Sequence, residues 1–155
     1  MIAVLQRVTR GKVEVASREV GSIERGLVVL LGIARGDSES DVLWMSKRIA
    51  SLRIFSDDAG KMNLNVQQVD GAILLVSQFT LLADLSSGNR PGFTAAEEPD
   101  IARIRCGEVA AQLLERGIRI AHGEFGANML VTLENDGPVT IVLDSKTQSK
   151  TSQID

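Results

Sequence analysis

The chain has 155 residues, with 17 basic and 20 acidic side chains and a formal net charge of −3, which suits one domain and leaves little room for a second. Its single cysteine, Cys106, excludes an intramolecular disulfide, and its single histidine, His122, essentially excludes a zinc site of Cys and His ligands. An isoelectric point near 5.2 and 3% aromatic residues argue against a long nucleic-acid footprint and against a stacking platform for single strands.

The N-terminal part of the chain is predicted to form strands. Apolar residues alternate with other residues over 2–8 and again over 13–15. The run 27–34 is almost wholly apolar, which indicates a fully buried strand, and it is far too short to span a bilayer. The first residues lack the pattern of a signal peptide, so we expect a cytoplasmic protein that does not bind membranes.

Two helices are predicted in the rest of the chain. A capping sequence of serines and acids over 38–41 precedes an amphipathic stripe of four apolar residues, namely Val42, Met45, Ile49 and Leu52. The second helix is expected to begin at Pro99, where a missing N–H costs nothing, and to end near Gly117. Its buried stripe is predicted to be Ala102, Cys106, Val109 and Leu113.

The remaining segments alternate between turns and strands. Residues 56–60 have turn composition, 72–82 are the strongest strand sequence, and 83–99 are expected to be a long ordered loop. Further strands are predicted over 118–121, 129–133 and 139–143. The fold class is therefore α/β and β-rich, a single layered domain of mostly antiparallel sheets with about two main helices on one face. We expect the domain to span 1–144 and the polar residues 145–155 to be a disordered tail.

One group of polar residues, Ser77, Gln78 and Thr80, lies inside an otherwise apolar predicted strand. Side chains alternate along a strand, so Ser77 and Phe79 would share one face while Gln78 and Thr80 share the other. Buried polar groups need partners, and a functional pocket is one place where they find them. The alternative is a half-exposed strand with a polar outer face.

A second group, residues 135–140, lies between two predicted strands and reads Asn-Asp-Gly-Pro-Val-Thr. These residue types are the usual ones in a β-turn, and the composition favours a plain turn. Spacing alone gives no reason to expect a cis bond before the proline.

A third arrangement, a hydrolase triad of Ser77, His122 and an aspartate, has little support because no Gly-x-Ser-x-Gly elbow surrounds Ser77. The aspartates lack the loop spacing of a calcium site, and the glycines match neither a Walker nor a dinucleotide-binding pattern. No metal or cofactor is therefore expected.

The chain resembles the D-aminoacyl-tRNA deacylases from residue 1 to about residue 142. The family's two signatures are Ser-Gln-x-x-Leu and Asn-x-Gly-Pro-x-Thr, which match residues 77–81 and 135–140. Four further stretches are similar to the family: Gln-Arg-Val-Thr-Arg at 6–10, Arg-Ile-Phe-Ser-Asp at 53–57, Gly-Lys-Met-Asn-Leu-Asn at 60–65 and Arg-Pro-Gly-Phe at 90–93. Each motif is weak alone, whereas all of them in order are highly specific.

The resemblance implies a homodimeric enzyme that hydrolyses the ester between a D-amino acid, or glycine, and the tRNA 3′ end. In the family the Gly-Pro bond is cis and reaches into the partner's pocket. Gly137 and Pro138 would then place main-chain carbonyls where an L side chain would have to point, and a rigid wall rejects on steric grounds. Arg7 would hold this segment, with Asn135 and Thr140 as supporting residues of the motif.

The resemblance also assigns the catalytic pocket. Ser77, Gln78 and Phe79 would frame the ester beside backbone N–H groups that stabilise an oxyanion. Residues 123–129 match a family pattern, Gly-x-Phe-x-Ala-x-Met, in which Phe125 and Met129 would line the terminal adenosine. Thr80 is the first candidate nucleophile, but no base lies beside it in the sequence. A positioned water or the tRNA 2′-hydroxyl is therefore the preferred driver of the reaction.

Two other functions stay open on the sequence alone: a non-catalytic β-rich dimeric binding protein, and a general esterase that uses Ser77 and His122. The excess of acidic over basic side chains argues against DNA as a partner, but not against recognition of one aminoacylated 3′ nucleotide of a tRNA. Local basic side chains can still steer phosphates, among them Arg7, Arg10, Lys12, Lys47 and Arg48.

Overall fold

The computed structural model describes residues 1–148. Its strands are β1 (Ile2–Val15), β2 (Arg18–Ile23), β3 (Gly26–Gly32), β4 (Phe55–Ser56), β5 (Met62–Leu64), β6 (Ala72–Ser77), β7 (Arg119–His122) and β8 (Leu130–Asp144). Its helices are α1 (Glu39–Ser51), the 3-10 helix η1 (Phe79–Leu82), α2 (Pro99–Glu115) and the short α3 (Ser145–Gln148). The predicted β-rich α/β domain is confirmed. Within residues 1–148, no helix has the length and apolar character needed to cross a membrane.

The main sheet is mixed. Its strand order is β2-β1-β3-β6-β7, and β8 also pairs with β1. The pairs that β1 makes are antiparallel, whereas β3–β6 and β6–β7 are parallel. Parallel neighbours need a crossover connection, and α1 and α2 lie in those two crossovers. Most strand pairs are antiparallel, as expected from the sequence, and the two parallel pairs that β6 makes were not predicted.

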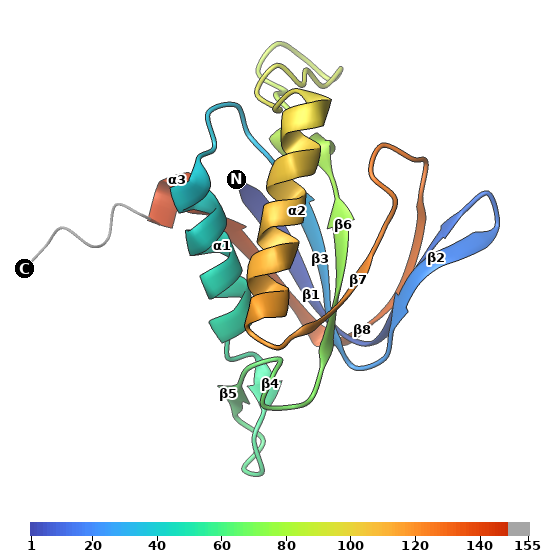
Figure 1. The fold of residues 1–155 in the computed structure, drawn as a ribbon, viewed down its shortest axis with the longest axis vertical. Helices are drawn as coiled ribbons and strands as arrows, with labels where there is room; N and C mark the ends of the chain where they lie inside the picture. Colours follow the sequence, from blue (N-terminus) through green and yellow to red (C-terminus); the bar gives the residue numbers. More distant parts are fainter. Residues whose placement is uncertain (149–155) are drawn as a thin grey trace, which may run out of the picture.

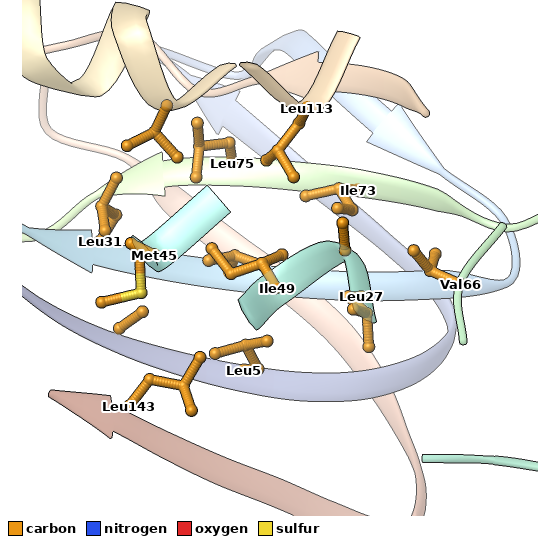
Figure 2. Packing of buried hydrophobic residues seen from close by; sticks show 14 of the residues in the cluster. Leu5, Leu27, Leu31, Met45, Ile49, Val66, Ile73, Leu75, Leu113 and Leu143 are labelled. Carbon is orange, nitrogen blue, oxygen red and sulfur yellow. The ribbon is translucent and has the colours of Figure 1, made fainter. Parts of the chain in front are cut away.

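Both long helices pack on one face of this sheet, as predicted (Figure 1). In the apolar layer between them and the sheet, Met45 and Ile49 of α1 and Leu113 of α2 are fully buried. Figure 2 shows these side chains gathered over Leu5 and Leu75 of the central strands. Full burial of such a side chain stabilises the fold by roughly 1.5–3 kcal/mol, so this layer fixes the sheet against the helices.

A second apolar cluster lies on the opposite face, within a bend of the sheet. The second half of β1 pairs with β2, and β8 follows β1 along nearly its whole length. The cluster consists of Val8, Val13, Ile23, Val28, Leu74 and Val76. The curled strands therefore cover part of their own sheet without a helix.

The segment 145–155, which we expected to be a disordered tail, is ordered at its start. The Met1 amino group donates to Ser145 Oγ at 3.1 Å and to Asp37 Oδ1 at 2.8 Å, and Ser145 Oγ donates to Asp41 Oδ1 at 2.6 Å. Ser145 is 4% exposed and begins α3. The expectation of disorder is wrong for Ser145 and Lys146, because contacts with Met1 and Asp41, which are distant in the sequence, hold these polar residues in place. Residues 149–155 lie outside the described part of the chain.

Candidate active site

A cavity of about 560 Å³ opens where β6 ends. Five residues that the sequence singled out line it together: Ser77, Gln78, Phe79, Phe125 and Met129. Walls also come from the ends of β3 and β6, the loop before α2, and the first turns of α2. The structure thus joins the first signature with the segment around residue 125, which lies far away in sequence.

The shape of this cavity depends on an early end to β6. The predicted strand over 72–82 is wrong after Ser77: Gln78 N donates to Leu31 O at 2.8 Å, and the chain then turns into η1. Gly32 makes room for that turn, because a Cβ there would lie 2.5 Å from Leu82 Cδ2 and 2.8 Å from Gln78 O. The expected alternation of Ser77 and Phe79 with Gln78 and Thr80 therefore does not apply.

Phe79 and Thr80 take different positions at the start of η1. Phe79 lines the cavity yet is 57% exposed, and its ring meets that of Phe93 edge-to-face at 5.0 Å. Thr80 is exposed, is not part of the cavity wall, and accepts a hydrogen bond from the Gln78 amide. Among residues 1–148 no carboxylate, histidine or lysine bonds the Thr80 hydroxyl, so no general base activates it there.

The one thiol at this cavity is not a nucleophile at neutral pH. Cys106 lines the wall, and burial raises its pKa to about 12. A cysteine reacts as its thiolate, and that form is scarce at pH 7 with such a pKa. The described residues also hold no group of three His, Cys, Asp or Glu side chains arranged to bind a metal ion.

The structure does not bring Ser77 and His122 together. His122 is exposed on β7, where it pairs with Leu75, and it is not part of the cavity wall. Over the described range, the side chains of Ser77 and His122 make no hydrogen bond to each other. A general esterase built on these two residues therefore has no geometric support.

The second signature lies in a bulge of a continuous strand, which corrects the prediction of two strands and a turn. Gln6 of β1 pairs with Thr140 and Val8 pairs with Asn135. Between these two pairs β8 uses three more residues than β1, so the segment around Gly137 bulges out of the ladder. The Gly137–Pro138 bond is cis, and both residues are exposed.

Polar side chains hold this bulge in place. Arg7, only 9% exposed, donates from Nε to Asp136 O at 2.9 Å and from Nη1 to Ile54 O at 2.7 Å. Asn135 Oδ1 accepts from Val139 N at 2.8 Å, and Asn135 Nδ2 donates to Thr140 Oγ1 at 3.2 Å. The expected position of Arg7 beside the motif agrees with this geometry, as does the supporting place of Asn135 and Thr140.

A glycine is required within the bulge. Gly137 has a φ of +141°, and a Cβ there would lie 2.6 Å from Val139 Cγ2 and 2.9 Å from Val139 N. Both contacts are closer than a real Cβ tolerates, so any side chain at this position displaces the backbone.

Within one chain the two signatures are far apart. Arg7 pairs with Leu27 near the start of β3, whereas Ser77 pairs with Leu31 near its end. Four residues along the strands, roughly 13 Å, and the three spacings β6–β3–β1–β8, roughly 14 Å, separate Ser77 from the bulge of β8. Gly137, Pro138, Arg7, Asn135 and Thr140 are all missing from the walls of the chain's own cavity.

Several cavity residues were not predicted from the sequence to belong to the site. Phe93 belongs to the stretch 90–93 that supported the resemblance, and Ala102 and Cys106 were expected only as a buried helix stripe. Leu31, Glu97 and Glu98 also line the cavity without any sequence signal, because only the packed fold brings their segments together.

The comparisons with known proteins agree over nearly the whole chain. The family model described as D-Tyr-tRNA(Tyr) deacylase matches residues 4–144. A D-aminoacyl-tRNA deacylase of Geobacter sulfurreducens is 49% identical over 152 residues, covering 98% of this chain and 100% of the relative. The protein of that name from Anaeromyxobacter dehalogenans is 52% identical over 146 residues, covering 94% of this chain and 98% of the relative.

Solved structures agree with this fold. One described as a c-Myc DNA unwinding element binding protein superimposes with a TM-score of 0.87 at 40% identity, covering 93% of this chain and 98% of that one. Another, described as a probable eukaryotic D-amino acid tRNA deacylase, has a TM-score of 0.80 at 15% identity, covering 92% and 97%, and supports the fold alone. From the family match and the near-full-length relatives, this chain belongs to the D-Tyr-tRNA(Tyr) deacylase family.

Proposed function

We propose that this chain is a D-aminoacyl-tRNA deacylase, which hydrolyses the ester between a D-amino acid, or glycine, and the 3′ end of a tRNA. The observation that carries this function is the cavity at the end of β6, where Ser77, Gln78 and Phe79 meet Phe125 and Met129. Relatives with that name share about half of the sequence over their whole length. The enzyme acts in the cytoplasm, where aminoacylated tRNA is used.

The cavity holds the terminal nucleotide and its ester. Phe125 and Met129 offer an aromatic and a thioether surface to the adenosine, while Ser77 and Gln78 frame the ester group. The first N–H groups of a helix have no acceptor inside it, so those of Phe79 and Thr80 are donors for the oxyanion that forms during hydrolysis.

The attacking group comes from water or from the tRNA itself. Thr80 has no base beside it, and the high pKa of Cys106 keeps its thiol neutral. The protein then contributes orientation and electrostatic stabilisation, and the 2′-hydroxyl of the terminal ribose or a positioned water supplies the nucleophile.

Chiral selection comes from Gly137 and Pro138 of a second copy. These residues are exposed and absent from the cavity of their own chain, while Arg7 and Asn135 fix the segment that carries them. Inserted into a partner's cavity, their main-chain carbonyls would occupy the space that an L side chain needs. A D side chain would point outward, which accounts for acceptance of many D-amino acids and of glycine.

An uncovered apolar row on the sheet supports a homodimer. Val4 of β1 pairs with Leu30 of β3 and with Val142 of β8, so the three side chains lie at one level on the face opposite α1 and α2. Val142 is 60% exposed. A second copy that packs on this row would exclude water from it and bring the two bulges toward the opposite cavities.

Hydrolysis of D-Tyr-tRNA, Gly-tRNA and L-Tyr-tRNA tests the activity. We expect release from the first two, and release from the L ester at a rate equal to that from the D ester would contradict chiral selection. The variants Gln78→Ala and Pro138→Ala should each lose deacylation. A non-catalytic dimer would change only in association or stability, and it would release no amino acid from any of these tRNAs.

Mixed dimers test the sharing of the site between subunits. Gln78→Ala damages the cavity and Pro138→Ala damages the bulge, so a random mixture of the two inactive proteins should regain about a quarter of the wild-type sites. Unmixed variants refolded in the same way are the control. A mixture that stays inactive would mean that each chain completes its own site.

Duplex DNA is the comparison ligand, because one structural relative is described as a DNA unwinding element binding protein. The net charge of −3 disfavours a grip on a long duplex. We expect excess duplex DNA to leave the hydrolysis of D-Tyr-tRNA unchanged, and strong competition would contradict a site that reads one 3′ nucleotide.

A further inference from the structure

We propose that Arg103 is a phosphate-binding residue at the edge of the cavity, which contacts the phosphodiester on the 5′ side of the terminal adenosine. This inference rests on the proposed function, since it places the adenosine against Phe125. The observation behind it is that the Arg103 guanidinium lies over the Phe125 ring, with its carbon 5.2 Å from the ring centroid. Phe125 is itself part of the cavity wall.

Nearby arginines are already paired with carboxylates. Arg35 lines the cavity but lies 2.6 Å from Glu98 Oε1, and Arg18 lies 3.3 Å from Oε2 of Glu124, the residue before Phe125. Arg103 is exposed and, among residues 1–148, has neither a salt bridge nor a side-chain hydrogen bond. It is therefore the cation beside Phe125 that is still free to bind a ligand anion.

The stacking geometry leaves the right atoms available. A guanidinium that stacks on a ring uses its flat face, whereas its N–H donors point outward in the plane. Those donors match the oxygens of a phosphate, which arginine binds through two parallel hydrogen bonds. A nucleoside held on the cavity side of Phe125 with its 5′ side toward solvent would place its 5′ phosphate beside Arg103.

The acidic groups at this end of the cavity make no ion pair with Arg103 in the described part of the chain. Glu98 is paired with Arg35, and Glu97, which keeps its charge, accepts a hydrogen bond from Glu98 N. Ala102, next to Arg103 in α2, also faces the cavity, so Arg103 stands at the boundary between the cavity and solvent.

Two minimal substrates that differ by one phosphate test the inference. The D-tyrosyl ester of adenosine has no phosphodiester, whereas the D-tyrosyl ester of the dinucleotide CpA has one. With Arg103→Gln we expect kcat/KM to fall about tenfold on the CpA ester and on D-Tyr-tRNA. On the adenosine ester we expect a change of less than twofold. The dependence of log kcat/KM on log salt concentration for D-Tyr-tRNA should weaken by about 0.7.

Arg25→Gln is the matched control. Arg25 also lies over an aromatic ring, that of Phe55 at 5.6 Å, but between β2 and β3 and outside the cavity wall. This variant removes the same charge and the same kind of stacking contact as Arg103→Gln, and we expect it to leave kcat/KM unchanged on all three substrates. A thermal melt of each variant checks the fold, and Arg103→Lys, which keeps the charge without the planar donors, should retain part of the CpA rate.

The outcomes are distinct. Equal losses of kcat/KM on the adenosine and CpA esters would mean that Arg103 acts through Phe125. No loss on either ester would mean that Arg103 has no role in the reaction. Both results overturn the inference while the deacylase activity stands. A wild-type protein that releases no D-tyrosine from any of the substrates overturns the proposed function, and the inference falls with it.

Discussion

The two signature segments lie at opposite ends of β3 and are held by different forces. The segment after Ser77 is shaped by apolar packing: Leu82 is 8% exposed and folds back over Gly32. The segment around Gly137 projects from the ladder and is held by hydrogen bonds from Arg7 and Asn135. The cavity end therefore depends on close apolar packing, whereas the bulge depends on a few polar contacts. Substitutions at the two ends should have different consequences.

The largest effect is expected in the chemical reactivity of the cavity end. Because burial raises the pKa of Cys106 to about 12, alkylation by iodoacetamide at pH 8 should be on the order of a thousandfold slower than that of a free cysteine. The rate should rise with pH until about pH 12, and guanidinium should restore ordinary reactivity. Fast labelling of the native protein would place a thiolate in the cavity and reopen thiol chemistry.

At the bulge, Gly137→Ala should reduce discrimination between D-Tyr-tRNA and L-Tyr-tRNA by about a hundredfold, as expected when a steric wall is displaced. The added Cβ would lie 2.9 Å from Val139 N, so the main chain must move. The control is Gly107→Ala on α2, where a Cβ meets nothing within 4 Å. That variant should be as selective as the wild type and about 1 kcal/mol more stable. Unchanged selectivity of Gly137→Ala would remove the bulge from chiral selection.

The polar support of the bulge is expected to matter for stability. Arg7→Ala leaves the carbonyls of Asp136 and Ile54 without their donor and should lower the free energy of unfolding by about 2 kcal/mol. Arg10 is the control on the same strand: its salt bridge to Glu134 is exposed, so Arg10→Ala should change stability by less than about 0.5 kcal/mol. Urea titrations measure both, and equal losses would mean that the bulge does not depend on Arg7.

The smallest effect is expected at His122, which belongs to neither end. It is exposed and outside the cavity wall, so His122→Ala should change kcat/KM for D-Tyr-tRNA by less than twofold. A loss of a hundredfold or more would instead indicate a histidine-dependent esterase.

Local patterns in the sequence predicted the parts of the fold that local forces determine. The stripe of Val42, Met45 and Ile49 correctly predicts α1 because helical periodicity and burial agree there. The apolar run of β3 is buried, as expected, because helices cover one face and the curled strands cover part of the other. Pro99 begins α2 as its missing N–H suggested.

Contacts between distant residues decided the features that the sequence did not predict. Leu81 and Leu82 read as a continued strand, since apolar runs look alike in strands and in buried turns; the space at Gly32 decides that they turn. Residues 135–138 have turn composition, yet β1 supplies partners on both sides and keeps β8 continuous. Ser145 is polar, and only the Met1 amino group and Asp41 make it buried.

The same held for the candidate site. Ser77, Gln78, Phe79, Phe125 and Met129, which the resemblance assigned to the catalytic pocket, line one cavity, whereas Thr80 does not. Their roles stay a prediction, and spacing alone left a half-exposed strand as the alternative. Phe93 and Leu31 complete the cavity, and only the packed loop and sheet bring them to it, since their local patterns did not indicate a place in the site.

Because β8 pairs with β1 on both sides of the bulge, the length of the bulge can change without changing the register of the sheet. The ladder is closed on the two sides of the bulge by the pairs Gln6–Thr140 and Val8–Asn135. A residue added or removed between Asn135 and Thr140 would therefore not shift Val142 against Val4. Such a change would alter only how far the bulge reaches. On the role proposed for Gly137 and Pro138, length variation at this position would change which acyl groups are admitted while the rest of the domain keeps its structure.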